Sequence, residues 1–187
     1  MAGQLILASA SPRRRELLDQ MGIQYYVAPV GLNETPLANE QPAVYVQRIA
    51  AEKSAAVKDA QIPVLAADTA VVLGNIIFGK PEHKNHALQM LSQLSGRTHQ
   101  VYTAVSLRGQ EHWQILSMTE VTFKNLSEQE MIAYWATGEP KDKAGAYAIQ
   151  GVGAMFVEAI SGSFSGVVGL PIFETVEILA KEGITIL

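Results

Sequence analysis

The chain has 187 residues, of which 48% are hydrophobic, and its 14 Lys and Arg against 18 Asp and Glu leave a net charge of -4. This composition suits one globular domain over residues 1–187 with a sizeable core, and it is more acidic than is usual for a protein that coats nucleic acid. The chain contains no cysteine, which excludes disulfides, thiolate nucleophiles and Cys-ligated zinc.

The hydrophobic runs are short. None approaches the ~18 residues that a membrane span requires, and the N-terminus lacks the long apolar region of a signal peptide. We therefore expect a cytoplasmic protein with no membrane or nucleic-acid partner.

The N-terminal third predicts a strand, a loop and two helices. Residues 4–8 form an apolar run typical of a buried strand. Ser11 and Pro12 then supply an N-cap and a first-turn proline for a helix that Gly22 ends. Pro42 starts a second helix with apolar residues at helical spacing.

The middle of the chain predicts three long strands. The first is an apolar run over 62–73 that Asp68 and Thr69 interrupt, followed by a turn, a short strand and a helix over 82–94. The segments 101–107 and 113–123 are expected to pair as antiparallel strands.

The last third predicts two helices separated by irregular structure. Ser127 caps a helix that ends near Gly138, and Pro171 opens the last helix. The stretch 145–169 is rich in glycine and small residues, so we expect strands and close-approach loops there. This order of elements predicts an α/β fold with a mixed central β-sheet and helices on both faces.

Residues 9–15, Ser-Ala-Ser-Pro-Arg-Arg-Arg, place hydroxyls, free N–H groups and guanidinium groups at the start of a helix. Such a terminus attracts anions, and arginine holds phosphate oxygens in a bidentate manner. The pattern therefore suits a polyphosphate. It is equally compatible with an ordinary helix cap that carries solvated basic residues.

Asp68 stands within an otherwise apolar strand. A carboxylate in that position needs a cationic partner, a metal or solvent from a cleft. It could serve as a metal ligand, as a base or as both, whereas the structural alternative is a side chain that faces solvent at the surface.

Residues 74–81 nearly match the phosphate-binding P-loop, but Pro81 stands where that loop needs Ser or Thr. Proline offers no hydroxyl to Mg²⁺ and no N–H to a phosphate. We therefore reject a P-loop and retain Lys80 as a single phosphate contact. Phe164 at the centre of 162–166 likewise argues against a serine nucleophile there.

Five ordered segments resemble one family over nearly the whole chain. They are LILASASPRRRELL, LAADTAVV, GKP, KDKAGAYAIQG and VVGLP, and together they are similar to the Maf family of nucleotide pyrophosphatases. The resemblance implies a fold related to the inosine triphosphate pyrophosphatases, with two lobes around a cleft, and a possible homodimer.

The resemblance also implies roles for individual residues. The family's proton acceptor matches Asp68, and two further cleft positions match Ser9 and Glu34. The phosphate-binding lysines and arginines of the family match four positions in this chain: Arg13, Arg14, Lys53 and Lys80. Together with the hydroxyl of Ser9, these cations are expected to hold the triphosphate.

Three positions resemble the family branch that acts on dTTP and UTP, namely Arg13, Thr69 and Gln150. The branch that acts on 7-methyl-GTP typically shows Trp, Gln and Glu instead. The chain departs from the common pattern at Ala148, where glycine is usual, and at Phe164 and Gly166, where Tyr and Asn are frequent. These departures bear on fine substrate preference rather than on the chemistry.

The implied reaction is attack of water on the α-phosphorus with loss of pyrophosphate, which requires charge neutralisation and alignment of the water. An isolated Asp with a pKa of about 3.9 is a weak base. We therefore expect a divalent metal cation, Mg²⁺ or Mn²⁺, with Asp68 and Glu34 as metal ligands. The alternatives are a 7-methyl-GTP pyrophosphatase and a nucleotide-binding regulator of septum formation without turnover.

Overall fold

The computed structural model describes residues 4–186. Its strands are β1 (Leu5–Leu7), β2 (Tyr25–Val27), β3 (Val64–Leu73), β4 (Ile76–Phe78), β5 (Thr98–Arg108), β6 (His112–Phe123) and β7 (Val157–Ser161). Its α-helices are α1 (Pro12–Gln20), α2 (Pro42–Ala56), α3 (Lys84–Leu94), α4 (Glu128–Ala136), α5 (Phe164–Val168) and α6 (Ile172–Lys181). Three 3-10 helices follow α4: η1 (Glu139–Asp142), η2 (Ala144–Ala146) and η3 (Val152–Phe156).

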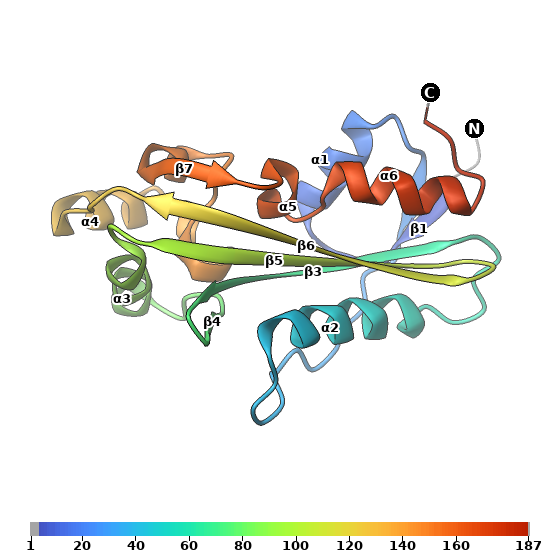
Figure 1. Ribbon diagram of the computed structural model, residues 1–187, viewed down its shortest axis with the longest axis horizontal. Coiled ribbons are helices and arrows are strands. Elements are labelled where there is room, and N and C mark those ends of the chain that lie inside the picture. The colour runs from blue at the N-terminus through green and yellow to red at the C-terminus, as the bar shows by residue number, and fades with distance from the viewer. Residues whose placement is uncertain (1–3, 187) are drawn as a thin grey trace.

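The strands form one sheet in the order β2-β1-β3-β5-β6-β7, and β4 also pairs with β3. Strand β1 runs parallel to β2 and β3, whereas the remaining pairs are antiparallel. The expected mixed sheet is therefore confirmed. Figure 1 shows α2 on one face of the sheet and α1, α5 and α6 on the other, as the sequence predicted.

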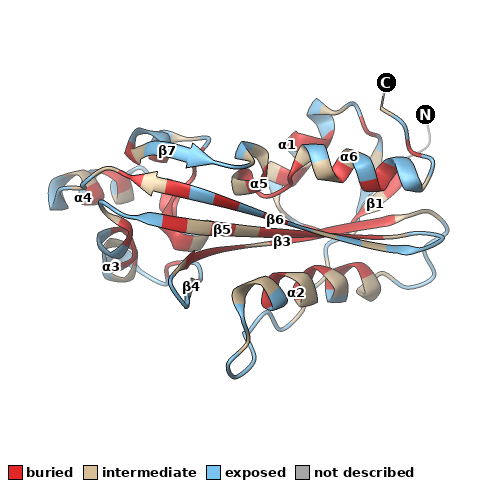
Figure 2. Cartoon of the chain, viewed as in Figure 1, coloured by how far each residue is buried: buried red, intermediate tan, exposed pale blue. Residues whose placement is uncertain are grey.

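Each face of the sheet buries its own apolar cluster. On one face, Val46 and Ile49 of α2 pack with Ala70 and Val72 of β3. The larger cluster on the other face includes Leu65 of the same strand. Figure 2 shows that most of β3 is buried, as expected for a strand that is covered on both faces.

Strand β3 is fully paired along only one of its edges. Strand β5 pairs with residues 64–72 of β3. On the opposite edge, β1 pairs with Val64 and Leu65, and β4 pairs with 71–73. Residues 66–70 therefore have no strand partner on that edge within the described part of the chain, and Asp68 lies in this gap.

Two predictions of local structure were only partly right. The stretch 145–169 contains the expected close-approach loops, as at Gly151 and Gly153, but β7 is its single strand, and 3-10 turns and the short helix α5 form much of the rest. Ser11 does occupy the N-cap position of α1, but its side chain makes no capping hydrogen bond. Instead, its N–H donates to Ser9 Oγ at 3.2 Å. Strand β2 was also missed, since three residues with partly exposed side chains carry no clear periodicity.

The other predicted elements are confirmed within a few residues. The hairpin of β5 and β6 turns at residues 109–111, as its polar, glycine-containing sequence indicated. Ser127 and Glu130 form a capping box at the start of α4. Within residues 4–186, no helix has both the length and the apolar character that crossing a membrane requires.

Candidate active site

A cavity of about 350 Å³ opens at the gap in the edge of β3. Its wall comes from the loop between β1 and α1, from α2 and β3, and from the segment that follows α4. Nine residues that the sequence predicted for the site line it: Ser9, Arg13, Arg14, Glu34, Lys53, Asp68, Thr69, Lys80 and Gln150. Ala148 also lines it, whereas Phe164 and Gly166 are not among its lining residues. The tertiary structure therefore brings together residues up to 141 positions apart in the chain, from Ser9 to Gln150.

Neighbouring residues of β3 face opposite sides of the sheet, because side chains alternate along a strand. Asp68 points toward α2, where its Oδ1 lies 2.8 Å from Lys53 Nζ. Thr69 points toward the opposite face, where its Oγ1 lies 2.9 Å from Thr103 Oγ1 of β5. One strand thus supplies a carboxylate and a hydroxyl to two sides of the same cavity.

The Lys53 ammonium joins two carboxylates. Lys53 lies four residues after Ile49, so it continues the buried face of α2 and projects onto β3. Its Nζ lies 2.8 Å from Asp68 Oδ1 and 3.0 Å from Glu34 Oε1. The Asp68 side chain is only 7% exposed, whereas that of Glu34 is 47% exposed. Lys53 therefore connects a buried carboxylate with one at the cavity mouth.

The surroundings of Asp68 make its carboxylate more basic than that of an exposed aspartate. Burial raises the pKa of Asp68, while the positive charges of Lys53 and Arg14 oppose that rise without cancelling it. The interpretation of Asp68 as a solvent-facing surface residue is wrong, because this side chain is buried and paired.

Arg14 ties three elements together at the other side of the cavity. Its Nε donates to Gly169 O at 2.8 Å, one terminal nitrogen donates to Ser9 Oγ at 3.1 Å, and the other donates to Thr69 Oγ1 at 3.3 Å. Burial lowers the pKa of this guanidinium, and the negative charges of Asp68 and Glu34 oppose that change. The buried cation therefore orders the loop after β1 against β3.

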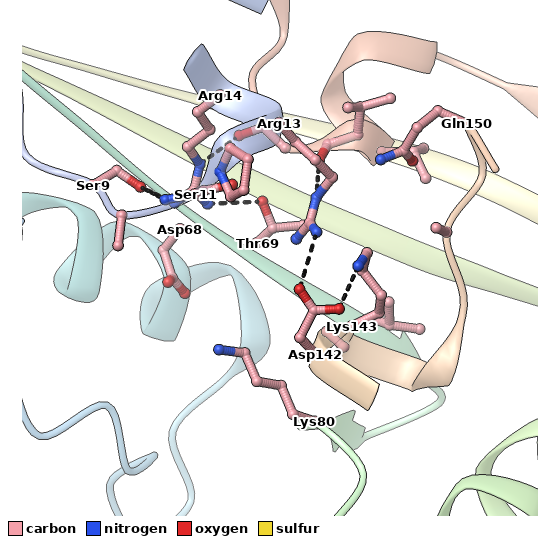
Figure 3. A pocket seen from close by; sticks show the side chains of 18 of the residues that line it. Ser9, Ser11, Arg13, Arg14, Asp68, Thr69, Lys80, Asp142, Lys143 and Gln150 are labelled. Carbon is pink, nitrogen blue, oxygen red and sulfur yellow. Dashed lines mark hydrogen bonds and ion pairs between the residues drawn. The ribbon is translucent and has the colours of Figure 1, made fainter. Parts of the chain in front are cut away.

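Arg13 is more accessible than Arg14, and it faces Asp142 in the segment that follows α4 (Figure 3). Its Nε donates to Val168 O at 3.3 Å, and a terminal nitrogen lies 3.8 Å from Asp142 Oδ2. Asp142 also accepts a hydrogen bond from Lys143. In Figure 3, Lys80 and Gln150 approach the cavity from opposite sides of the view.

Three further residues line the cavity without having been predicted for the site: Asp142, Lys143 and Tyr147. A signal for them was available, since they belong to the same KDKAGAYAIQG segment as Gln150. Two charged residues just before a glycine-rich turn are compatible with an ordinary solvated loop, and only the tertiary structure places them opposite Arg13.

The hydroxyl of Tyr147 forms a hydrogen bond with a buried histidine, His99. Its hydroxyl lies 2.8 Å from His99 Nε2 of β5, and both rings pack edge to face against Phe123. His99 is fully buried, and its Nδ1 has no hydrogen-bond partner among residues 4–186. Burial lowers the pKa of His99 to about 4, so the ring is neutral at pH 7.

The carboxylates suit a divalent cation that arrives with a phosphate ligand. Within residues 4–186, no group of three or more acidic or histidine side chains is arranged to hold a metal by itself. However, the carboxylates of Asp68 and Glu34 are neighbours, because one oxygen of each lies within 3.0 Å of Lys53 Nζ, and the ammonium occupies the point between those two oxygens. Mg²⁺ is commonly held by one or two carboxylates together with substrate phosphates and water, and these two residues fit that donor set.

A family model described as Maf-like protein matches residues 4–182. The chain is 54% identical over 185 residues to a Methylococcus capsulatus protein named dTTP/UTP pyrophosphatase, across 97% of this chain and 92% of that protein. It is 48% identical over 195 residues to a Haemophilus ducreyi protein named nucleoside triphosphate pyrophosphatase, across 100% of this chain and 99% of that one.

Among solved structures, the Staphylococcus aureus Ham1 protein aligns with a TM-score of 0.47 and 17% identity, over 64% of this chain and 71% of that chain.

The buried His99 predicts a pH dependence of stability. The pKa of His99 is about 4 in the folded protein against 6.5 ordinarily. Above pH 6.5 the ring is neutral in both states, so folding carries no penalty from it. As the pH falls from 6.5 toward 4, the unfolded chain binds a proton that the folded protein does not, and the protein loses stability. The loss should reach roughly 3 kcal/mol below pH 4. Urea unfolding of His99→Gln between pH 4 and 7 should show a correspondingly flatter dependence. Tyr147→Phe should keep the wild-type dependence, because burial is the cause of the shift. An equally steep dependence in His99→Gln would contradict this origin.

Proposed function

Because this chain belongs to the Maf family, we propose that it hydrolyses dTTP and UTP between the α and β phosphates, releasing a nucleoside monophosphate and pyrophosphate. The observation that carries this proposal is the buried Asp68, which lies in a cavity lined by several basic side chains. A triphosphate brings negative charge that such cations neutralise, and hydrolysis additionally needs a base near the attacked phosphorus.

In this mechanism the cations and the base have separate positions. Arg13, Lys53 and Lys80 line the cavity and would contact phosphate oxygens. Asp68 would accept the proton of the attacking water, and its raised pKa makes it a stronger base than an exposed aspartate. Lys53 positions this carboxylate through the contact at 2.8 Å.

Replacement of Asp68 tests the base. Asp68→Asn should lower kcat at least roughly a hundredfold while the affinity for nucleotide changes little, since the amide has nearly the same size but cannot take the proton. Steady-state kinetics with UTP, together with calorimetric binding of an unreactive UTP analogue, would measure both quantities. Asp59→Asn, at an exposed position, is the matched control.

A near-wild-type rate in Asp68→Asn would remove Asp68 from the mechanism. Binding of UTP by the wild-type protein with no release of pyrophosphate would instead favour the regulator without turnover.

We further propose that a divalent cation, Mg²⁺ or Mn²⁺, is held by Asp68 and Glu34 together with the substrate phosphates. When bound, the cation neutralises phosphate charge and makes the attacking water more acidic. Both carboxylates face the Lys53 ammonium, and that lysine would then share them with the cation.

Glu34→Gln should raise the Mg²⁺ concentration that gives half-maximal activity by at least about tenfold, because a neutral amide replaces an anionic ligand. Paramagnetic resonance of Mn²⁺, in the presence of an unreactive UTP analogue, should show the same loss of affinity. Glu52→Gln on α2 serves as the control. Full activity of the wild-type protein in excess chelator would exclude the metal.

The choice of base is proposed to depend on Arg13, Thr69 and Gln150. All three line the cavity, and the Gln150 side chain forms no hydrogen bond with any other residue within 4–186. A free amide offers a donor and an acceptor, which match the carbonyl and N–H of uracil or thymine. A glutamate at this position could only accept hydrogen bonds.

UTP and dTTP should therefore exceed ATP, GTP and 7-methyl-GTP by on the order of tenfold to a hundredfold in kcat/KM, because a wrong base leaves polar groups unpaired at ~1–3 kcal/mol each. Gln150→Glu should narrow this gap by harming the pyrimidine substrates most. Gln93→Glu, on the exposed side of α3, should leave it unchanged. Faster hydrolysis of 7-methyl-GTP than of UTP by the wild-type protein would contradict the base assignment.

The cytoplasmic location, the homodimer and the absence of a nucleic-acid partner stay predictions.

A further inference from the structure

Gln150 lies in a turn whose backbone is closed by a hydrogen bond from Gly151 N–H to Ala148 O at 3.3 Å. The residues before the turn are buried, whereas Gln150 itself is exposed at the cavity. Its direction is therefore set by the two flanks of the turn, because its own side chain forms no hydrogen bond with another residue in the described part of the chain.

Both flanks of this turn are anchored on one pair of side chains, Glu139 and Tyr134. On the N-terminal flank, Ala148 N–H donates to Tyr134 Oη at 3.1 Å. On the C-terminal flank, Val152 N–H donates to Glu139 Oε2 at 2.9 Å, and Gly153 N–H donates to Glu139 Oε1 at 3.0 Å. Tyr134 closes the connection by donating to Glu139 Oε1 at 2.6 Å.

We call Glu139 and Tyr134 together the anchor of this turn. Its strength comes from the charge of Glu139 and the burial of Tyr134. Three donors converge on one carboxylate, and hydrogen bonds to an ionised acceptor are about twice as strong as neutral ones. Burial alone would raise the pKa of Glu139, but the hydrogen bonds from Tyr134 and the two backbone N–H groups outweigh burial and lower it. Tyr134 is buried and packs edge to face on Phe156.

Two glycines allow the turn to approach the anchor this closely. A Cβ added at Gly151 would lie 2.2 Å from Glu139 Oε2, and one added at Gly153 would lie 2.6 Å from Tyr134 Oη. Gly151 has φ -114° and ψ -150°, an extended conformation that other residues also adopt. The requirement for glycine at position 151 therefore comes from the contact with Glu139.

We infer that Glu139, together with Tyr134, positions Gln150 and thereby sets the preference for pyrimidine over purine triphosphates. Neither Glu139 nor Tyr134 is among the residues that line the cavity, so both act through the turn and not by touching the base. This inference rests on the proposed role of Gln150. Asp68 and Lys53 share no hydrogen bond with the anchor, so the chemistry and the base choice should respond separately.

The test compares kcat/KM for UTP with kcat/KM for ATP in each variant. Glu139→Gln places an amide donor against a backbone N–H or the tyrosine hydroxyl, so it should lower the UTP to ATP ratio roughly tenfold, mainly through UTP. Tyr134→Phe keeps the ring packing and should lower the ratio in the same direction. Glu128→Gln, in the exposed first turn of α4, is the matched control and should keep the ratio.

A double-variant cycle tests the contact itself. Gly151→Ala should lower the UTP to ATP ratio by itself, because its methyl group displaces the Glu139 carboxylate. In the Glu139→Ala background the space is free, so Gly151→Ala should change the ratio by less than about twofold. If the two effects multiply independently, Glu139 and Gly151 do not act through this contact, and the inference is wrong.

The ratio separates positioning from a merely structural role. A general loss of stability lowers turnover of both nucleotides equally and leaves the ratio unchanged, and that outcome in Glu139→Gln and Tyr134→Phe would overturn the inference. Tyr134→Phe keeps the test open should the Glu139 variants fail to fold. If the wild-type protein itself shows no preference for UTP, the proposed base choice fails first, and the inference fails with it. The wild-type protein therefore tests the proposed base choice, whereas the Glu139 and Tyr134 variants test the positioning role.

Discussion

The site depends on the unpaired edge of β3 between β1 and β4. Strand β5 pairs with β3 along the opposite edge, where Asp68 lies across from Ala104, whereas the backbone at Asp68 has no strand partner on the free side in the described part of the chain. An unpaired strand edge is normally a liability, because it invites pairing with another chain. Here the loop after β1 and the segment after α4 cover the gap and leave a cavity there.

The buried charges of the cavity are arranged in two groups on either side of β3. Lys53 holds the carboxylates of Asp68 and Glu34 on the α2 side, whereas Arg14 holds Ser9 and Thr69 on the other. A buried charge without a partner is strongly destabilising, so each group must be nearly complete before a substrate binds. The cavity is nevertheless locally basic in a chain of net charge -4, because five basic side chains line it (Arg13, Arg14, Lys53, Lys80 and Lys143) against three acidic ones (Glu34, Asp68 and Asp142).

Chemistry and recognition come from different parts of the chain. The carboxylates and most cations lie on β3, α1, α2 and their adjoining loops, which the sheet and its two apolar faces hold in place. Gln150 lies in an irregular segment between two 3-10 helices, η2 and η3, and not in a strand whose backbone hydrogen bonds a neighbouring strand would satisfy. Such a segment needs side chains to satisfy its backbone, and Tyr134 and Glu139 supply those hydrogen bonds.

The amino-acid sequence predicted the α/β class, most helix and strand positions, and nine of the residues that line the cavity, but it assigned no role to Asp142, Lys143 or Tyr147. Apolar periodicity, Pro12 and the Ser127 cap act over a few residues, so local pattern sufficed for the elements. The site residues came from ordered motifs. Only the tertiary structure decided that β1 and β4 share one edge of β3, that Lys53 pairs with Asp68, and that Glu139 anchors the turn of Gln150. Those contacts join distant segments, and no local preference specifies them.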